Sequence, residues 1–459
     1  MNENEQNSGV NRRDFLRGGS VATLMTMLGG VELFAQPADK PADAKPAGSK
    51  VKVALIGCGA WGRELLKTLG SQSLGSVVAE VVALCDTYPS AMRKCATDAP
   101  GAKQFADYNE VFADKSVSAV IIATPTHQRR DIVLAAIKAG KHVYCEAPLA
   151  HSIEDAKAIA LAAQAAPKQI FQAGLQMRSD AQRRFLLPFI RSGNLGATVM
   201  GRAQWHKQQS WRAAAANAER ELALNWRLNR ATSLGLMGEV GIHQIDQVGW
   251  FLNAHPLAVT GFKSLVKWND GRDVPETIQA VFEFPNQVQF TYDATLASSF
   301  DADYEVYAGT YATVVLRENK AWMFKEVDSP LFGWEVYCRK DQFFRETGLS
   351  LKAGGSKQAA MSETVNAPVP TEAAPVYQAL ENFLTNVFNQ DVAIQSFVES
   401  YGADDEAALL AQVEKDTASR RKPGASALDG FQATVTAIKT NEAILSGQRL
   451  EFKDEWYQL

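Results

Sequence analysis

Residues 52–62 of the chain read KVALIGCGAWG. The first five of these residues form a short apolar run rich in β-formers, which predicts a buried parallel strand. Residues 63–69 then carry leucines at helical spacing, so a helix is expected directly after the glycines. A strand, a G-x-G-x-x-G turn and a helix in this order are the context in which the motif indicates a dinucleotide-binding turn.

The three glycines of the motif have separate roles in such a turn. Gly57 permits the tight turn, Gly59 lets the backbone approach a pyrophosphate, and Gly62 allows the helix to pack closely on the strand. The N-terminus of the helix faces the anion, because its free N–H groups favour negative charge. Ala60 and Trp61 lie inside the same turn and are predicted to contact the cofactor together with the glycines.

A second apolar run, residues 77–85, ends in Asp86. An acidic residue at the end of the second strand hydrogen-bonds the adenosine ribose hydroxyls and repels a 2′-phosphate, so Asp86 favours NAD over NADP. Arg93 and Lys94 follow closely in the sequence, so NADP remains an alternative cofactor. The structural alternative for Asp86 is a turn or helix-cap residue.

The alternation of strands and helices continues along the chain. Residues 119–123 and 142–145 read as strands, and residues 132–139 between them read as a helix. This alternation predicts an α/β fold with a doubly wound parallel Rossmann sheet in residues 51–170.

Several separated motifs occur in the order found in one enzyme family. They are residues 56–62 (IGCGAWG), 123–125 (ATP), 139–146 (AGKHVYCE), 148–150 (PLA), 172–178, 225–227 (NWR) and 238–246 (GEVGIHQID). With these motifs the chain resembles the Gfo/Idh/MocA oxidoreductases over residues 51–459. The resemblance implies a Rossmann domain followed by an α/β domain with a large open, mostly antiparallel sheet. It also implies a nicotinamide cofactor and often a sugar, inositol or related polyol as substrate.

The residues after 170 also contain strand-like runs. Residues 258–266, 277–284, 288–296 and 304–316 read as strands. They are predicted to build the open sheet of a second domain, residues 171–459, whose last hundred residues read as helices. One face of such a sheet must be covered, so a homo-oligomer through the open sheet is expected. Residues 352–375 read as an irregular excursion.

Glu239, His243 and Asp246 can be interpreted without the resemblance. On an α-helix they lie at i, i+4 and i+7 and share one polar face. The ordinary pKa of histidine suits proton transfer near neutral pH, and a neighbouring carboxylate can orient the ring. We predict His243 as the catalytic base, oriented by Glu239 or Asp246. The alternative is a helix with a buried, hydrogen-bonded histidine.

One position departs from the family's pattern. Family members usually carry Glu-Lys-Pro where this chain has Glu146-Ala147-Pro148. The resemblance implies that the lysine touches both substrate and nicotinamide ribose, whereas Ala147 can neither donate a hydrogen bond nor carry charge. The absence of the lysine argues against ordinary dehydrogenase turnover. It does not affect cofactor binding by the glycine turn. Loss of the positive charge is expected to make His243 more basic than in relatives.

Further polar and aromatic residues are predicted to line the site. Some follow strands of the first sheet, at the strand ends where ligands of such folds bind. Others are candidates for a sugar, since aromatic faces suit sugar rings; packing or surface positions are the alternative for each. The predicted cofactor residues are Thr124, Pro125, His127 and Glu146, and the predicted substrate residues are Arg178, Trp226 and Arg227.

Composition excludes several classes of protein. A chain of 459 residues with 46% hydrophobic residues can form two or three domains with a sizeable core. Its 47 basic and 51 acidic side chains give a formal net charge of −4, so no basic excess points to nucleic acid. Five cysteines are too few for a disulfide scaffold, and no Cys/His cluster has metal-ligand spacing. No metal site is expected.

Residues 1–50 do not read as part of the fold. Arg12-Arg13 precede Phe15-Leu16, and a weakly apolar run follows at residues 18–35, which is typical of a twin-arginine (Tat) export signal. The expected location is the periplasm or another exported compartment, reached through the Tat machinery; the alternative is an amphipathic start to a cytosolic protein. Because this route carries folded proteins and free nucleotides are scarce outside the cytosol, a tightly bound cofactor is expected.

Three functional hypotheses follow. The first is an exported NAD(P)-dependent oxidoreductase acting on a sugar, polyol or glycoside. The second is an NAD-dependent glycosidase or lyase that oxidises its substrate transiently, eliminates a glycosidic bond and reduces the product again. The third is a non-catalytic sugar-binding relative, which Ala147 favours and His243 opposes. Reduction of the cofactor by a sugar would support the first hypothesis. Release of an aglycone without net redox change would support the second, and sugar binding without either reaction would support the third.

Overall fold

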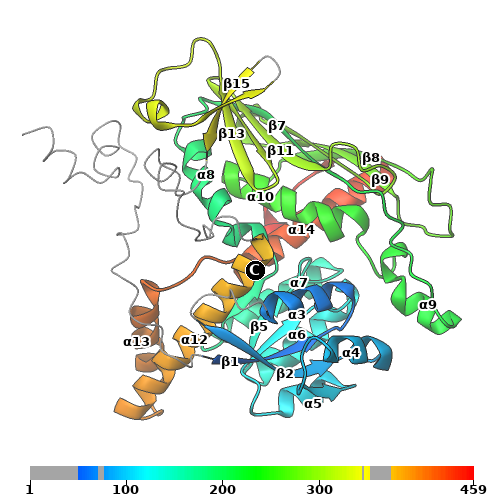
Figure 1. Cartoon of the computed structure of the whole chain (residues 1–459), viewed down its shortest axis with the longest axis vertical. Helices are drawn as coiled ribbons and strands as arrows, with labels where there is room; N and C mark the ends of the chain where they lie inside the picture. The colour runs from blue at the N-terminus through cyan, green and yellow to red at the C-terminus, as the bar shows by residue number, and fades with distance from the viewer. Residues whose placement is uncertain (1–49, 71–76, 344–345, 352–373) are drawn as a thin grey trace, which may run out of the picture.

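The computed structural model of the chain describes residues 50–70, 77–343, 346–351 and 374–459. The predicted export signal and the predicted excursion at 352–375 lie almost entirely outside these ranges. The described residues form two α/β parts, the first drawn in blue to cyan and the second mainly in green to yellow (Figure 1).

The first part is built on a six-stranded sheet with the strand order β3-β2-β1-β4-β5-β6. Its paired strands are all parallel, which is the arrangement of a Rossmann fold and confirms the predicted first domain's architecture. Every residue of β4 and β5 is buried, as the apolar runs predicted. The strands are β1 (Lys50–Ile56), β2 (Val78–Cys85), β3 (Lys103–Phe105), β4 (Ala119–Ile122), β5 (His142–Cys145) and β6 (Phe171–Ala173). The helices are α3 (Ala60–Gly70), α4 (Pro89–Ala96), α5 (Tyr108–Ala113), α6 (Arg129–Lys138) and α7 (Ile153–Gln164).

The second part is built on a ten-stranded sheet with the order β14-β15-β13-β12-β11-β7-β10-β9-β8-β16. All neighbouring strands are antiparallel except β7 and β10, which confirms the expected large, mostly antiparallel sheet. The strands are β7 (Thr198–His206), β8 (Ala258–Ser264), β9 (Thr277–Glu283), β10 (Gln289–Thr295), β11 (Asp303–Gly309), β12 (Ala312–Arg317), β13 (Lys320–Lys325), β14 (Lys340–Phe343), β15 (Glu346–Leu351) and β16 (Leu450–Glu451).

One predicted strand is wrong. Residues 304–316 are two antiparallel strands, β11 and β12, which pair Glu305 with Leu316. The chain reverses after Gly309, where a Cβ would lie 2.1 Å from the carbonyl oxygen of Leu195. The apolar alternation continues through both strands, so the pattern alone did not reveal the turn.

Helices cover one face of the second sheet and lie between the two sheets (Figure 1). They are α8 (Ala181–Arg191), α10 (Ile242–Leu252) and α14 (Ala427–Ser446), whereas α9 (Ala218–Leu224) projects from the edge. The chain then returns to the first part through α12 (Pro375–Tyr401), which is followed by α13 (Glu406–Ala418). Phe383 and Leu384 of α12 share a core with Leu55 and Leu65, so part of the predicted second domain completes the first.

The described helices include none that is both long and apolar enough to cross a membrane. All five cysteines are free, and four of them are buried.

Candidate active site

The glycine turn joins β1 to α3. Gly57 has a φ of +100°, in the left-handed region that favours glycine. A Cβ at Gly62 would lie 1.9 Å from the carbonyl oxygen of Gly57, so the turn itself excludes a side chain there. A Cβ at Gly59 would meet nothing within 4 Å. The turn therefore leaves open space at Gly59, where a phosphate group can approach the backbone.

Asp86 closes the turn from the end of β2. Its carboxylate accepts hydrogen bonds from the N–H groups of Cys58 (2.8 Å) and Tyr88 (2.7 Å). The guanidinium of Arg220, from α9, lies 3.5 Å from the centroid of the Tyr88 ring. The turn role that was the alternative for Asp86 is therefore present. A carboxylate has about four acceptor positions, so Asp86 keeps capacity for ribose hydroxyls.

Arg129 holds the loops that follow β4 and β5. Its Nε donates to the carbonyl oxygen of Thr124 (3.0 Å), and its Nη1 donates to those of Glu146 (3.0 Å) and Pro148. Both loops follow the carboxyl ends of parallel strands, and Arg129 fixes them to each other. The hydroxyl of Thr124 is buried within this arrangement and has no hydrogen-bond partner among the described residues.

Glu146 is a buried carboxyl group beside the glycine turn. Burial raises its pKa to about 7, against the opposing effects of a hydrogen bond from Trp61 and the charge of Arg129. Its Oε1 has no hydrogen-bond partner in the described part of the chain. Trp61 thus connects the glycine turn with Glu146, whereas the sequence predicted only contact with cofactor.

His243 begins the polar face of α10. Burial, together with the smaller effect of the Arg129 charge, lowers the pKa of His243 to about 4. Its Nδ1 is buried and makes no hydrogen bond to any described residue. The expected rise in basicity considered only the missing lysine; desolvation and Arg129 act in the opposite direction, and the ring is neutral at pH 7.

Glu239 does not contact His243. It lies in a π-helical turn, η4 (Met237–Gly241), which precedes α10 and changes the i, i+4 geometry that a continuous α-helix would give. Its carboxylate accepts from the hydroxyls of Thr126 (3.0 Å) and Ser233 (3.4 Å). These two hydroxyls are the hydrogen-bond donors to Glu239 in the described structure, and its predicted role in orienting His243 stays a prediction.

Asp246 is also paired elsewhere. Arg178 donates to both of its oxygens at 2.9 Å, and a third nitrogen of Arg178 donates to Asp429 at 2.7 Å. Arg178 therefore ties η2 (Gln176–Ser179) to α10 and α14. Arg178 is thus paired with two carboxylates, while the predicted roles of Asp246 toward His243 and of Arg178 toward a substrate stay predictions.

Trp226 and Arg227 come from the second part, on the short helix η3 (Trp226–Leu228). The Trp226 ring lies 6.3 Å from the His127 ring, between centroids, and the Arg227 guanidinium lies 4.6 Å from the Trp226 ring. Arg227 Nε is 3.9 Å from Glu239 Oε2. The loop after β4, η3 and η4 therefore meet at one place.

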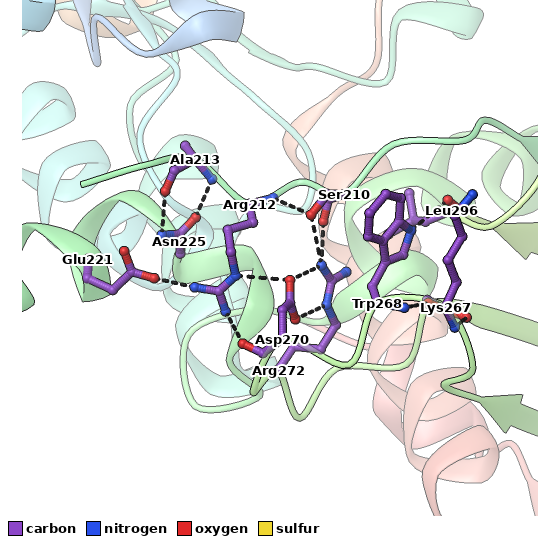
Figure 2. Close-up of polar contacts among 11 residues, drawn as sticks. Ser210, Arg212, Ala213, Glu221, Asn225, Lys267, Trp268, Asp270, Arg272 and Leu296 are labelled. Carbon is purple, nitrogen blue, oxygen red and sulfur yellow. Dashed lines mark hydrogen bonds and ion pairs between the residues drawn. The ribbon is translucent and has the colours of Figure 1, made fainter.

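Figure 2 shows the network that anchors the chain before η3. The Asn225 side chain donates to and accepts from the backbone of Ala213, at 3.0 and 2.7 Å. Asp270 accepts from Arg212 (2.9 Å) and from Arg272 (2.7 and 2.6 Å), which lowers the pKa of Asp270. Asn225 immediately precedes Trp226, so this network fixes where η3 begins.

Comparison with known proteins agrees with this architecture. A family model described as "Oxidoreductase family, NAD-binding Rossmann fold" matches residues 51–174, and one described as "GFO/IDH/MocA C-terminal domain" matches residues 186–314. Together they cover more than half of the chain. The chain belongs to the Gfo/Idh/MocA oxidoreductase family.

Individual Gfo/Idh/MocA relatives are distant. Inositol 2-dehydrogenase of Salmonella typhimurium is 29% identical over 207 residues, which are 44% of this chain and 55% of that protein. The chain spans about half the length of the curated relatives it matches. An oxidoreductase domain protein from Kribbella flavida has a TM-score of 0.67 at 16% identity, over 89% of this chain and 100% of that one. Levoglucosan dehydrogenase in complex with NADH and levoglucosan has a TM-score of 0.62 at 18% identity, over 88% and 99%.

Sequence reasoning missed two residues of this Gfo/Idh/MocA site. Arg129 was not among the predicted site residues, yet it holds both loops and its charge helps to lower the pKa of His243. Arg220 was not considered, although it crosses from α9 to Tyr88. A basic residue directly after a strand-end loop was a usable signal for Arg129; nothing in the spacing pointed to Arg220.

Proposed function

We propose that the protein is an exported NAD(P)-dependent dehydrogenase that oxidises a sugar, polyol or glycoside and keeps its cofactor tightly bound. The observation that carries the redox assignment is a set of buried polar atoms around Arg129 and the loops after β4 and β5 that have no partner among the described residues: Thr124 Oγ1, Glu146 Oε1 and His243 Nδ1. Buried polar atoms are normally hydrogen-bonded, so this group supports a site completed by ligands. The names of the inositol and levoglucosan dehydrogenases support a polyol or sugar as substrate.

The residues present fit a dinucleotide. Gly57, Gly59 and Gly62 provide the turn and its open approach, while Thr124 and Glu146 offer polar atoms at the adjoining strand ends. Bound NAD(P) would supply the hydride acceptor. Asp86 favours NAD, because its carboxylate keeps free acceptor positions and would repel a 2′-phosphate.

We assign His243 as the base that accepts the proton of the substrate's hydroxyl group. Its ring is neutral at pH 7, because burial lowers its pKa to about 4, and only a neutral imidazole can accept a proton. Glu239 accepts a hydrogen bond from the hydroxyl of Thr126. Its role is therefore to position the second part of the chain against the loop after β4.

Export and tight binding rest on the sequence. The paired arginines at positions 12 and 13 and the apolar run after them support the Tat route. A redox enzyme outside the cytosol would keep its nucleotide and return it to the starting redox state with a second substrate.

The decisive experiment denatures the purified exported protein and identifies any released nucleotide by mass spectrometry. Stoichiometric NAD or NADP is expected, followed by a change in reduced-cofactor absorbance when sugars are added. A protein without nucleotide that also fails to bind added NAD or NADP would contradict the proposal and favour a sugar-binding relative.

A redox-assisted glycosidase or lyase is the second candidate. It is favoured by Ala147, which removes the usual lysine, and by Glu146, whose pKa of about 7 gives the site a second proton-transfer group near neutral pH. Nitrophenyl glycosides separate the two activities. Release of nitrophenol without net cofactor reduction would support the glycosidase, whereas net reduction without release supports the dehydrogenase.

A homo-oligomer through the second sheet is part of the proposal. Residues of β9 alternate strictly, with Ile278, Ala280 and Phe282 buried toward the helices. The strand registers place one cross-strand row on the opposite face: Thr260, Val281, Thr291, Arg202, Val306, Val315 and Trp322. Four of these seven side chains are apolar, and Val281 is 43% exposed in the single chain. Such a face supports contact with a second copy.

A further inference from the structure

The loop after β5 lacks a cation that can reach a substrate. Ala147 is 7% exposed and carries no polar group where the family resemblance places a lysine. Arg129 is adjacent, but its guanidinium donates to the carbonyl oxygens of Thr124, Glu146 and Pro148. This arginine therefore holds the loops and has few donors left for a ligand.

Among the described residues beside this loop, Arg227 is the cation that remains available. Apart from its ring contact with Trp226, its guanidinium has one ion-pair contact in the described chain, Nε to Glu239 Oε2 at 3.9 Å, and no hydrogen bond. Its side chain is 41% exposed, although burial lowers its pKa. A guanidinium carries five N–H donors in a planar fork, so most of its donors lack a partner.

The charges around Arg227 do not balance at neutral pH. His243 is neutral, because its pKa is lowered to about 4, and Glu146 is only partly ionised, because its pKa is raised to about 7. Two guanidinium groups, Arg129 and Arg227, act on this part of the site, and Arg227 has Glu239 as its one ion-pair contact in the described chain. A group of this composition favours a ligand that brings a negative charge.

We propose that Arg227 takes over the cationic role of the missing lysine and binds a carboxylate of the substrate, so that the substrate is a uronic acid or a glycoside of one. The planar fork of arginine matches a carboxylate with two parallel hydrogen bonds, whereas a sugar hydroxyl can use only one of its donors at a time. This inference rests on the proposed oxidation of a carbohydrate and narrows its substrate class.

The test compares matched pairs on the full-length protein with added NAD: glucuronic acid with glucose, and galacturonic acid with galactose. Each acid is expected to have the higher kcat/KM of its pair. Arg227→Met is expected to lower kcat/KM for the acids about 10- to 100-fold, mainly through KM, and to lower it for the neutral sugars by a clearly smaller factor. Arg227→Lys restores part of the loss, because it keeps the charge without the fork.

Arg230→Met is the matched control, since Arg230 lies three residues away and its Nε donates to the backbone oxygen of Asp273. It is expected to leave the selectivity unchanged. Oxidation of neutral sugars in preference to the acids would overturn this inference while the proposed dehydrogenase stands. Equal losses for both sugars in Arg227→Met, or weaker NAD binding, would also overturn it. If no sugar of either kind is oxidised, the proposed function itself fails.

Discussion

Glu146 is 5% exposed, and burial raises its pKa to about 7 from the ordinary value of 4.5. A carboxyl group whose folded pKa is raised contributes its full stability below the unfolded pKa and loses that contribution as pH rises through 7. The loss amounts to about 3 kcal/mol. The glutamine of Glu146→Gln cannot ionise. The parent should therefore lose more of its free energy of unfolding than the variant does between pH 5 and pH 8.

Urea unfolding at both pH values, at equal nucleotide content, measures this difference. Glu455→Gln is the control, because the Glu455 side chain is 70% exposed and no such gain is expected. Parallel stability curves for Glu146→Gln and the parent would show that Glu146 ionises normally in the folded protein.

His243→Asn should abolish most substrate oxidation while bound nucleotide remains. Loss of a general base typically lowers kcat by about 100- to 10,000-fold. In the parent protein the rate should stay constant from about pH 8 down to about pH 5 and fall as pH approaches 4, because protonation then removes the base. A rate that already falls near pH 6.5 would show that His243 keeps its ordinary pKa.

The candidate site was predictable in residue type but not in pairing. The spacing of Glu239, His243 and Asp246 predicted a shared polar face on one helix. It could not show that Asp246 is taken by Arg178, because Arg178 is distant in the sequence and lies on a different element. Nor could it show the π turn, because the spacing was interpreted on a continuous α-helix.

At the scale of elements, the glycine turn gives a prediction that separates packing from binding. Gly62→Ala should destabilise the fold, because its Cβ would lie 1.9 Å from a backbone oxygen that cannot move away. Gly59→Ala should leave thermal stability close to that of the parent, because its Cβ meets no atom, yet it should weaken nucleotide binding about 10-fold or more by blocking close approach.

Thermal unfolding and isothermal titration with NAD measure the two effects. Gly70→Ala serves as a control, since it adds a Cβ in open space at the far end of α3 and should change neither. Unimpaired NAD binding by Gly59→Ala would place the pyrophosphate elsewhere.

Strands and helices were easier to predict where one periodicity held. The parallel sheet followed from short, continuous apolar runs that nothing interrupts, as in β4 and β5. The second sheet was harder, because the alternation of apolar residues continues from β11 into β12 across the turn at Gly309. The return of α12 to the first part depends on contacts between residues some 300 positions apart, such as Leu65 and Phe383, which local pattern cannot reveal.

At the scale of the whole molecule, α14 joins the two parts. It packs against α7 of the first part and against β8 of the second, and Gly430 lies so close to Leu149 that a Cβ would meet its side chain at 3.0 Å. The glycine turn and His243 come from different parts, so their spacing depends on this helix. The helices fill one face of the second sheet, which leaves its other face to be covered by something else (Figure 1).

We expect that face to be the contact between copies. Val281→Asp places a charge in the cross-strand row and should convert an oligomer into monomers, because burying an unpaired carboxylate costs several kcal/mol in an apolar interface. Light scattering coupled to gel filtration measures the mass, and NAD titration should show unchanged binding, because the substitution lies on the face away from the helices and the site. Val392→Asp is the control, since Val392 is 45% exposed on α12, outside the sheet. A parent protein that is monomeric at micromolar concentration, or a Val281→Asp variant that keeps the parent's mass, would move the oligomer contact away from this sheet.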